Sequence, residues 1–303
     1  MKQCLNVYQV DAFTEVKFMG NPAGVVTNAN DLSEAQMLKL ARELNNSETA
    51  FILDPIDETH DYRVRFFTPT VEVPSCGHAS LAAGYIWSVE GGFKKKRMNQ
   101  LIQIGVLPID IVKENNSSLV YMTQGEVEIG EELVGPTRSK VISSLNINED
   151  DLIDSLPIQI ISTGHSKVMV PLKSLKTLNS ISPNLSALSE LSEEIKHNCF
   201  FLFAIDESEP GVLTHARMFA PKIGINEDPV TGNGNGPLGA YLIYHKILEA
   251  DERGEVSFKS KQGEVMGRAG YATVKVNVDN GRPAKVRVGG SCEIAFKTKI
   301  EIE

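Results

Sequence analysis

Two segments of the chain are apolar on nearly every side. Residues 79–87 and residues 238–247 have helical patterns that leave no polar face. A helix of this kind has to be buried on all sides. Strand patterns outnumber these helices in both halves of the sequence, and an encircling sheet is the economical way to bury a helix from every side. The pattern therefore predicts an α+β fold in which a curled, mainly antiparallel sheet surrounds one central helix in each half.

The sequence also repeats itself across its two halves. Residues 65–86 and residues 217–243 share an Arg-x-Phe-x-Pro strand end, a glycine-bearing stretch, and an apolar helix in which Tyr85 aligns with Tyr241. In the same order, residues 164–170 stand where residues 20–26 stand, and residues 199–204 where residues 48–53 stand. Such an echo indicates duplication and predicts two pseudo-symmetric lobes.

The boundary between the lobes is expected near residue 125. Residues 125–155 are acidic and turn-rich, which makes them the best linker candidate. The predicted N-terminal lobe comprises residues 1–124, which a C-terminal strand over residues 292–303 can complete, and the predicted C-terminal lobe comprises residues 125–291.

Other elements follow from alternation and capping signals. A helix is expected from the Ser33–Gln36 capping-box pattern to the break at Asn45. The last helix is expected to begin with Pro237 in its first turn. Strands are expected at residues 5–10, 24–27, 49–53, 62–67, 101–112, 118–122, 158–162, 200–204, 212–219, 271–276, 285–288 and 292–302.

Composition narrows the function class. The chain has 303 residues and a formal net charge of −9, so nucleic acid and anionic membrane are unfavourable partners. No window reaches the ~18 apolar residues that a membrane span needs, and the first residues lack a signal-peptide pattern. The four cysteines have neither metal-ligand nor disulfide-framework spacing, which favours a reducing compartment. We therefore expect a cytoplasmic protein that acts on a small molecule.

Candidate chemistry lies where the two apolar helices begin. Gly77 and Gly232 each precede such a helix. The first N–H groups of a helix have no internal partner, and its N-terminus carries a partial positive charge, so each start can hold an anion such as a carboxylate. The alternative is that the glycines only allow a tight turn.

Four side chains near these helices could take part. Glu48 enters an apolar strand, where partial desolvation strengthens a carboxylate as a base, although most such residues are exposed. Asp228 precedes Pro229 and can hold an amine or an imidazole, or simply start an Asx-turn. Cys76 at a helix start can be a thiolate or a small filler. One Cys-x-His pattern, Cys76 with His78, is a weak metal signal, so no metal is predicted.

Taken together, the motifs resemble the PhzF family of isomerases from phenazine biosynthesis, which has the diaminopimelate epimerase-like fold. The matching motifs span nearly the whole chain in order, and they are Asp11-Ala12-Phe13, Gly20-Asn21-Pro22-Ala23-Gly24-Val25, Ser47-Glu48-Thr49-Ala50-Phe51, Arg65-Phe66-Phe67-Thr68-Pro69, Cys76-Gly77-His78-Ala79, Glu227-Asp228-Pro229-Val230-Thr231-Gly232 and Gly289-Gly290.

The resemblance implies two β-barrel lobes around central helices, an active site in the cleft between them, no cofactor, and a homodimer. It assigns Glu48 as the acid/base and places His78 and Asp228 beside it as catalytic residues. It further implies that a carboxylate-bearing substrate contacts these residues: Asn21, Cys76, Gly77, Thr231, Gly232 and Asn233.

Two departures from the resembled patterns bear on the substrate. Asn233 and Asn235 stand where the phenazine enzyme has Ser and His, so the phenazine precursor is not expected as substrate. Thr231 or Gly232 stands where a two-thiol epimerase of this fold has its second cysteine. The hypothesis is an isomerase in which Glu48 abstracts and returns a proton. The alternatives are a Cys76-dependent racemase or epimerase and a catalytically silent ligand-binding or interaction protein.

Overall fold

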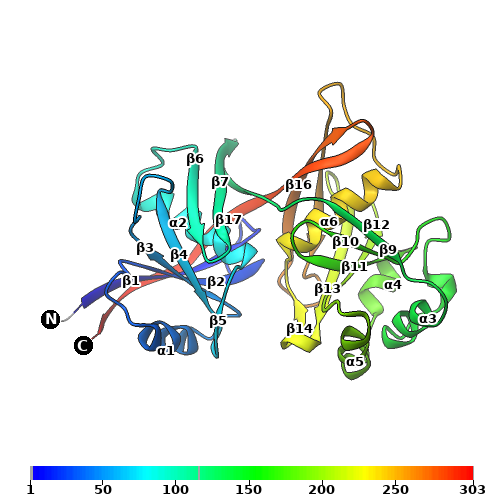
Figure 1. Cartoon of the computed structure of the whole chain (residues 1–303), viewed down its shortest axis with the longest axis horizontal. Coiled ribbons are helices and arrows are strands. Elements are labelled where there is room, and N and C mark those ends of the chain that lie inside the picture. Colours follow the sequence, from blue (N-terminus) through cyan, green and yellow to red (C-terminus); the bar gives the residue numbers. More distant parts are fainter. Residues whose placement is uncertain (1–2, 115–116, 303) are drawn as a thin grey trace. The chain divides into compact units, whose positions relative to one another are not determined.

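The computed structural model describes residues 3–114 and 117–302, whose helices and strands are labelled in Figure 1. The strands are β1 Gln3–Ala12, β2 Asn21–Thr27, β3 Thr49–Leu53, β4 Tyr62–Phe67, β5 Glu72–Val73, β6 Arg97–Ile102, β7 Gly105–Glu114, β8 Ser117–Thr123, β9 Glu128–Glu132, β10 Gln159–Ser162, β11 Ser166–Leu172, β12 Phe200–Ile205, β13 Thr214–Ala220, β14 Ile225–Asp228, β15 Glu255–Gln262, β16 Gly270–Asp279 and β17 Arg282–Ile302. The α-helices are α1 Glu34–Leu44, α2 Gly77–Glu90, α3 Gly135–Ser144, α4 Leu175–Ser180, α5 Leu185–Ile195 and α6 Gly232–Tyr244.

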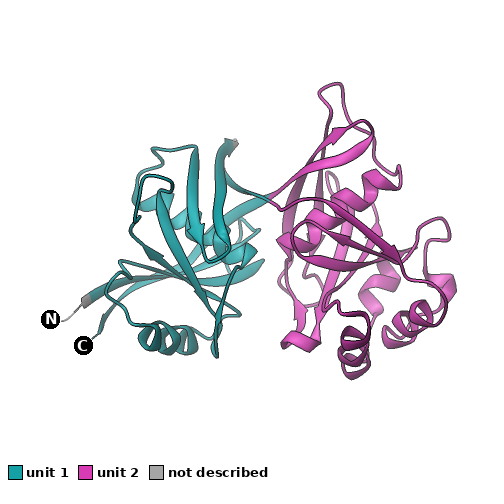
Figure 2. Ribbon diagram, in the orientation of Figure 1, with its two compact units in different colours: residues 1–123, 289–303 teal, residues 124–288 magenta. Residues whose placement is uncertain are grey.

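The chain divides into two compact units (Figure 2). The first unit consists of residues 1–123 together with residues 289–303, and the second consists of residues 124–288. The long strand β17 contributes its first part to the second unit and its last part to the first.

Eight strands of the first unit form a closed barrel around α2. Antiparallel pairs join β17 to β1, β1 to β2, β3 to β4, β6 to β7 and β7 to β8, while β2 and β3, and β4 and β6, are parallel. Pairing of β8 with β17 closes the ring. Helix α2 contacts β1, β2, β3, β4, β7 and β8 from inside (Figure 1). The encircling sheet predicted from the apolar helix is thus confirmed.

The second unit repeats this order of strands. The parallel pairs β2–β3 and β4–β6 of the first unit have counterparts in the second unit, where β11 pairs with β12 and β13 pairs with β15. Helix α6 contacts β10, β11 and β16. Strands β16 and β17 are joined by Asn280 and Gly281, both with positive φ, as in a type I′ hairpin turn. Helices α3, α4 and α5 contribute to an apolar core on the other side of β11 and β12.

An arginine ion pair recurs at the same place in both units. Arg65 donates from Nε to Glu72 at 2.7 Å, and Arg217 donates from Nε to Glu227 at 2.8 Å. Each guanidinium also lies over the ring of the phenylalanine two residues later. In the first unit the ion pair connects β4 to the short strand β5, and in the second unit it connects β13 to the short strand β14. Each short strand leads into the central helix. The Arg-x-Phe repeat is therefore a structural feature of the two barrels.

The start of α6 differs from the prediction. The helix begins at Gly232 rather than near Pro237, and Pro237 lies inside it. This stretch of the helix has glycines because the barrel wall leaves no room for a side chain. A Cβ on Gly234 would lie 2.4 Å from the Phe201 ring, and one on Gly239 would lie 2.7 Å from Val274. Gly84, the eighth residue of α2, meets its barrel wall in the same way as Gly239, the eighth residue of α6. Aligning Gly84 with Gly239 shifts the two helices by one residue from the predicted Tyr85–Tyr241 match.

Other predictions need correction too. The strand expected at residues 101–112 is the hairpin of β6 and β7, and the two strands expected after residue 285 are the single strand β17. The linker candidate at residues 125–155 contains β9 and α3. Helices α4 and α5 and strand β15 were not predicted. The Ser33 capping box is confirmed, since the Ser33 side chain accepts from the Gln36 N–H and the Gln36 side chain accepts from the Ser33 N–H.

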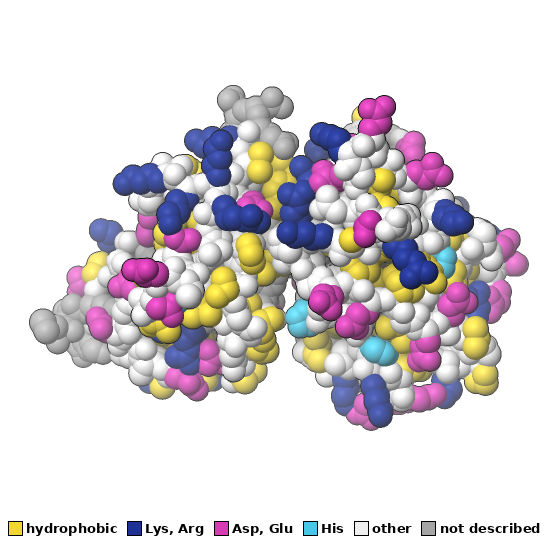
Figure 3. All heavy atoms as spheres, turned by 45° about the horizontal axis from the view of Figure 1, so that its top comes forward, with side chains coloured by type: hydrophobic (Ala, Val, Ile, Leu, Met, Phe, Trp, Pro, Cys, Tyr) yellow, Lys and Arg dark blue, Asp and Glu magenta, His cyan; other side chains and the backbone are white. Residues whose placement is uncertain are grey.

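Surface charges of both signs are interspersed on the face shown in Figure 3. The basic run at residues 94–97 is partly paired with acidic residues: Lys95 bonds Asp61, and Arg97 Nε lies 2.9 Å from Asp110. Among the described residues, no helix combines the length and the apolar character that crossing a membrane requires.

A buried chain of hydrogen bonds fixes α2 to the barrel wall. The Tyr62 hydroxyl donates to Gln100 Oε1 at 3.0 Å, and Gln100 Nε2 donates to the Ser80 hydroxyl at 3.1 Å. All three side chains are at most 1% exposed. Because α2 carries the candidate residues Gly77 and His78 in its first turn, this chain also stabilises the site.

We expect Tyr62→Phe to lower the free energy of unfolding by about 1–3 kcal/mol, because it leaves the buried Gln100 oxygen without its donor. Tyr244→Phe is the matched control, since Tyr244 is 42% exposed, and its effect should stay within about 0.5 kcal/mol. Urea denaturation of both variants measures the difference. Equal stability of the two variants would contradict a structural role for the chain.

Candidate active site

The predicted site residues lie in both units, and most of them are at or beside the starts of α2 and α6. The first group surrounds the start of α2. Cys76 is the N-cap residue, its backbone is extended, and its side chain makes no capping hydrogen bond. The first N–H groups of α2 therefore receive no cap from this side chain, which leaves them able to bind an anion.

Glu48 lies immediately before β3 and is held there by the backbone. Its carbonyl oxygen accepts from the Gly24 N–H at 3.3 Å, within the parallel pairing of β2 and β3. Gly24 permits the close approach, since a Cβ there would lie 2.7 Å from Thr49 Oγ1. The Glu48 side chain is 16% exposed. The barrel thus holds a largely buried carboxylate directly before β3.

The imidazole of His78 lies between a carboxylate and a thiol. Its Nε2 is 3.5 Å from Glu48 Oε2 and 3.4 Å from the Ser47 hydroxyl, and its Nδ1 is 3.5 Å from Cys76 Sγ. The His78 side chain is 8% exposed. A carboxylate beside an imidazole can accept a proton, and the imidazole can hold a hydrogen bond to it or to a ligand.

The other two predicted residues of this unit each begin an element. Asn21 is the first residue of β2, is 1% exposed, and pairs in register with Ala12. Gly77 is the first residue of α2, and a Cβ there would lie 3.4 Å from Met122. Gly77 therefore leaves the helix start uncovered by any side chain of its own.

The second group surrounds the start of α6. The Thr231 hydroxyl donates to Asp228 Oδ2 at 2.5 Å instead of capping its own helix. Gln262 Nε2 donates to the Asp228 carbonyl at 2.8 Å and to Thr231 Oγ1 at 3.0 Å, and Gln262 Oε1 accepts from the Thr231 N–H at 3.0 Å. Gly232 is buried and Asn233 is half-buried. This network holds the Asp228 carboxylate beside the N-terminus of α6.

Sequence reasoning missed two residues of the second group. Gln262 ends β15, a strand that was not predicted. Lys167 lies on β11, where Val168 and Val170 face the core beneath α3 to α5, so Lys167 points to the α6 side of the sheet. The lysine is 2% exposed and donates only to two backbone carbonyls, at 3.4 and 3.5 Å, among the described residues.

The internal repeat contains a signal that could have pointed to Lys167 as a residue near the start of α6. The Val168 N–H donates to the Cys199 carbonyl at 2.9 Å, just as Gly24 donates to Glu48. Cys199 therefore occupies the place of Glu48, and Lys167 the place of Ala23. The two helix starts have equivalent backbones but different side chains.

The sequence of the whole chain identifies its relatives. The family model of PhzC-PhzF, described as phenazine biosynthesis-like protein, matches residues 10–297. The chain belongs to the PhzC-PhzF family. An uncharacterized isomerase of Clostridium acetobutylicum is 51% identical over 295 residues, which are 97% of each chain.

Two further relatives connect the family to a fold and an activity. The crystal structure of the Bacillus anthracis phenazine biosynthesis protein of the PhzF family superposes with a TM-score of 0.88 at 31% identity, covering 99% of this chain and all of that one. The trans-2,3-dihydro-3-hydroxyanthranilate isomerase of Pseudomonas aeruginosa is 28% identical, covering 93% of this chain and 94% of that protein. The predicted fold class is confirmed, and this PhzF-family protein is an isomerase.

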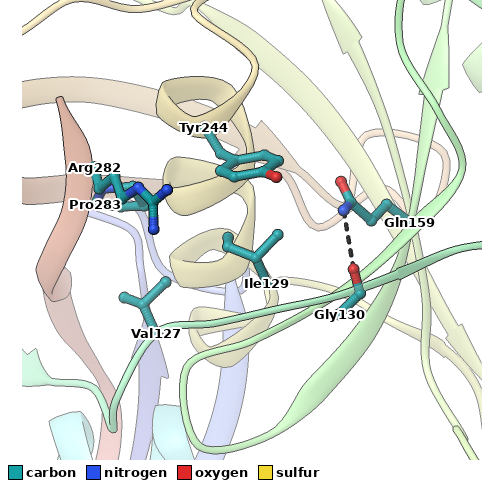
Figure 4. A pocket seen from close by; sticks show the side chains of 7 residues that line it. All are labelled: Val127, Ile129, Gly130, Gln159, Tyr244, Arg282 and Pro283. Carbon is teal, nitrogen blue, oxygen red and sulfur yellow. Dashed lines mark hydrogen bonds between the residues drawn. The ribbon is translucent and has the colours of Figure 1, made fainter.

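A cavity of about 450 Å³ in the second unit contains none of the predicted site residues (Figure 4). Its polar lining residue Gln159 is already hydrogen-bonded, because it donates to the carbonyl of Gly130, another lining residue, and accepts from His245. Arg282 is its one charged lining residue. The cavity therefore offers no pair of groups for acid/base chemistry, and the start of α2 and the start of α6 remain the candidate sites of their units. The cavity is lined by Val127, Ile129, Gly130, Gln159, Tyr244, Arg282 and Pro283.

Burial lowers the pKa of Lys167, although Cys199 and Asp228 partly oppose the shift. The unfolded state therefore binds a proton more tightly than the folded state, so protonation of Lys167 destabilises the fold. We expect Lys167→Met to raise the free energy of unfolding by about 1–2 kcal/mol near neutral pH. The gain should shrink as the pH rises from the folded pKa toward the ordinary lysine value of about 10.4 and vanish above it.

Denaturation curves at a series of pH values measure this gain. Lys176→Met is the control, because Lys176 is exposed and its removal should leave the pH dependence unchanged. A Lys167→Met variant that is less stable than the wild type at neutral pH would show that the ammonium is better satisfied than its contacts indicate.

Proposed function

We propose that this protein is a cofactor-independent isomerase of a small carboxylate-bearing metabolite, in which Glu48 removes a proton from one carbon and returns it to another. The observation that carries the proposal is the pair of Glu48 and His78, with 3.5 Å between Oε2 and Nε2, beside the uncapped start of α2. A general acid/base has to lie within reach of the proton that it moves and be held in place by its surroundings.

The proton balance needs only one group that is charged at the start. The Glu48 carboxylate takes the proton from carbon, and the electron pair of the C–H bond enters the substrate as an anion. The first N–H groups of α2 stabilise the negative charge of the substrate, because they form a preorganised set of donors. Neutral Glu48 then returns the proton to another carbon, which restores the carboxylate. His78, whose Nε2 lies 3.5 Å from Glu48 Oε2, keeps the carboxyl group oriented.

The residues of the second unit have a binding role in this proposal. Asp228 is oriented by Thr231 and Gln262, so its carboxylate can hold a cationic amino group of a substrate. Gly232 and Asn233, in the first turn of α6, supply N–H donors. The relative named as trans-2,3-dihydro-3-hydroxyanthranilate isomerase supports a substrate of this kind, because an anthranilate carries both a carboxylate and an amino group.

Glu48→Gln tests the assignment directly. We expect the variant to lose proton exchange by about 10²- to 10⁴-fold, because the amide cannot accept the proton. The measurement is deuterium incorporation from deuterium oxide into a panel of amino and hydroxy acids that includes trans-2,3-dihydro-3-hydroxyanthranilate. Glu43→Gln, on the exposed side of α1, is the matched control. Labelling by Glu48→Gln at the rate of the control would sink the assignment.

Cys76→Ser separates this proposal from a thiol-dependent racemase or epimerase. The position that corresponds to Cys76 in the second unit is Thr231, whose hydroxyl donates to Asp228 and is not a thiol base. We expect Cys76→Ser to retain exchange within about tenfold of the wild type, because the acid/base group is unchanged. Loss of exchange in Cys76→Ser with full exchange in Glu48→Gln would favour the thiol mechanism instead.

A further inference from the structure

Three different metal-ligating side chains meet at the start of α2. In the sequence, Cys76 and His78 form a Cys-x-His pattern without a third ligand close by. The fold supplies the third ligand from the strand β3 region, since one atom each of Glu48, Cys76 and His78 lie within 4.8 Å of one another. The group is an oxygen, a sulfur and a nitrogen donor on rigid elements.

The three ligand atoms, which lie within 4.8 Å of one another, come within about 1 Å of the spacing around a tetrahedral dication. Zinc bonds of about 2.0–2.3 Å to N, O and S ligands place neighbouring ligand atoms about 3.3–3.6 Å apart. The structure has 3.5 Å between Cys76 Sγ and His78 Nδ1, and 3.5 Å between His78 Nε2 and Glu48 Oε2. A metal uses one of the two ring nitrogens, so one side chain has to move by about 1 Å, which rotation of the short Cys76 side chain can supply.

The charges also balance. Zinc binding releases the thiol proton of Cys76 and leaves a thiolate and a carboxylate around a dication, so the site has no net charge. Such balance limits the cost of desolvation beside the positive end of α2. Three protein ligands leave the fourth position to water, an arrangement that binds zinc in many proteins.

We propose that Glu48, Cys76 and His78 form a binding site for Zn²⁺, and that the bound ion holds the isomerase inactive. The bound metal draws electron density from the Glu48 carboxylate and makes it a much weaker base, so Glu48 cannot take a proton from carbon while the metal is bound. The binding site stands on the geometry of the three side chains, and its inhibitory effect rests on the proposed function of Glu48.

Cobalt titration of the full chain tests the site without reference to activity. Co²⁺ takes the place of zinc and gives a thiolate-to-cobalt charge-transfer band together with the intense visible bands of a four-coordinate ion. We expect both in the wild type, loss of the charge-transfer band in Cys76→Ser, and at least about tenfold weaker Co²⁺ binding in Glu48→Gln and His78→Gln. Cys199→Ser is the matched control, because Cys199 is also half-buried but lies in the second unit.

The outcomes separate the two proposals. A wild-type protein without the charge-transfer band, or a band that persists in Cys76→Ser and disappears in Cys199→Ser, overturns the metal site. Circular dichroism confirms that each variant is folded. If Co²⁺ binds as expected, Zn²⁺ should stop deuterium exchange and a chelator should restore it. Exchange that continues in the zinc-loaded wild type overturns the inhibitory role, whereas exchange that survives Glu48→Gln overturns the proposed function whatever the cobalt spectrum shows.

Discussion

The burial of an all-apolar helix is the constraint on which each unit depends. Helices α2 and α6 have no polar face, so their stability requires strands on every side. The ring of eight strands around α2 meets that requirement. Close walls in turn demand glycine along the helices, as the 2.9 Å approach of a Cβ on Gly84 to Ile109 shows. Since the helix body is enclosed, its N-terminus is where backbone donors can meet a ligand.

The repeat of this architecture separates structure from chemistry. The backbone bond from β2 to Glu48 recurs from β11 to Cys199, and the arginine ion pair recurs with Glu72 and Glu227. These shared interactions build the two barrels. The side chains at the helix starts differ: one unit has a carboxylate, an imidazole and a thiol, and the other has Asp228 held by Thr231 and a buried lysine. The two units thus share a backbone frame and differ in the side chains at the helix starts.

Elements whose pattern is local were predictable. Strands β3 and β4 match their predicted bounds because alternation or an unbroken apolar run marks them, and the Ser33 capping box marks the start of α1. The start of α6 was not predictable in this way, because glycine and proline signal turns unless a close wall makes them useful in a helix. Linker-like residues 125–155 contain α3 because its apolar side packs against the core shared with α5, and that packing leaves only a weak trace in a polar sequence.

The sequence by itself determined the two buried helices, the duplicated framework, the family, and the individual residues Glu48, His78 and Asp228 as candidates. These follow from motifs, periodicity and the internal repeat, all of which are visible in the sequence without knowledge of the fold. Only the tertiary structure decided what those residues contact: Glu48 and Cys76 on either side of His78, Thr231 on Asp228, and Lys167 and Gln262 near the start of α6. Side chains separated by many positions meet through strand register and barrel closure, and hydrophobic packing of the whole chain sets both.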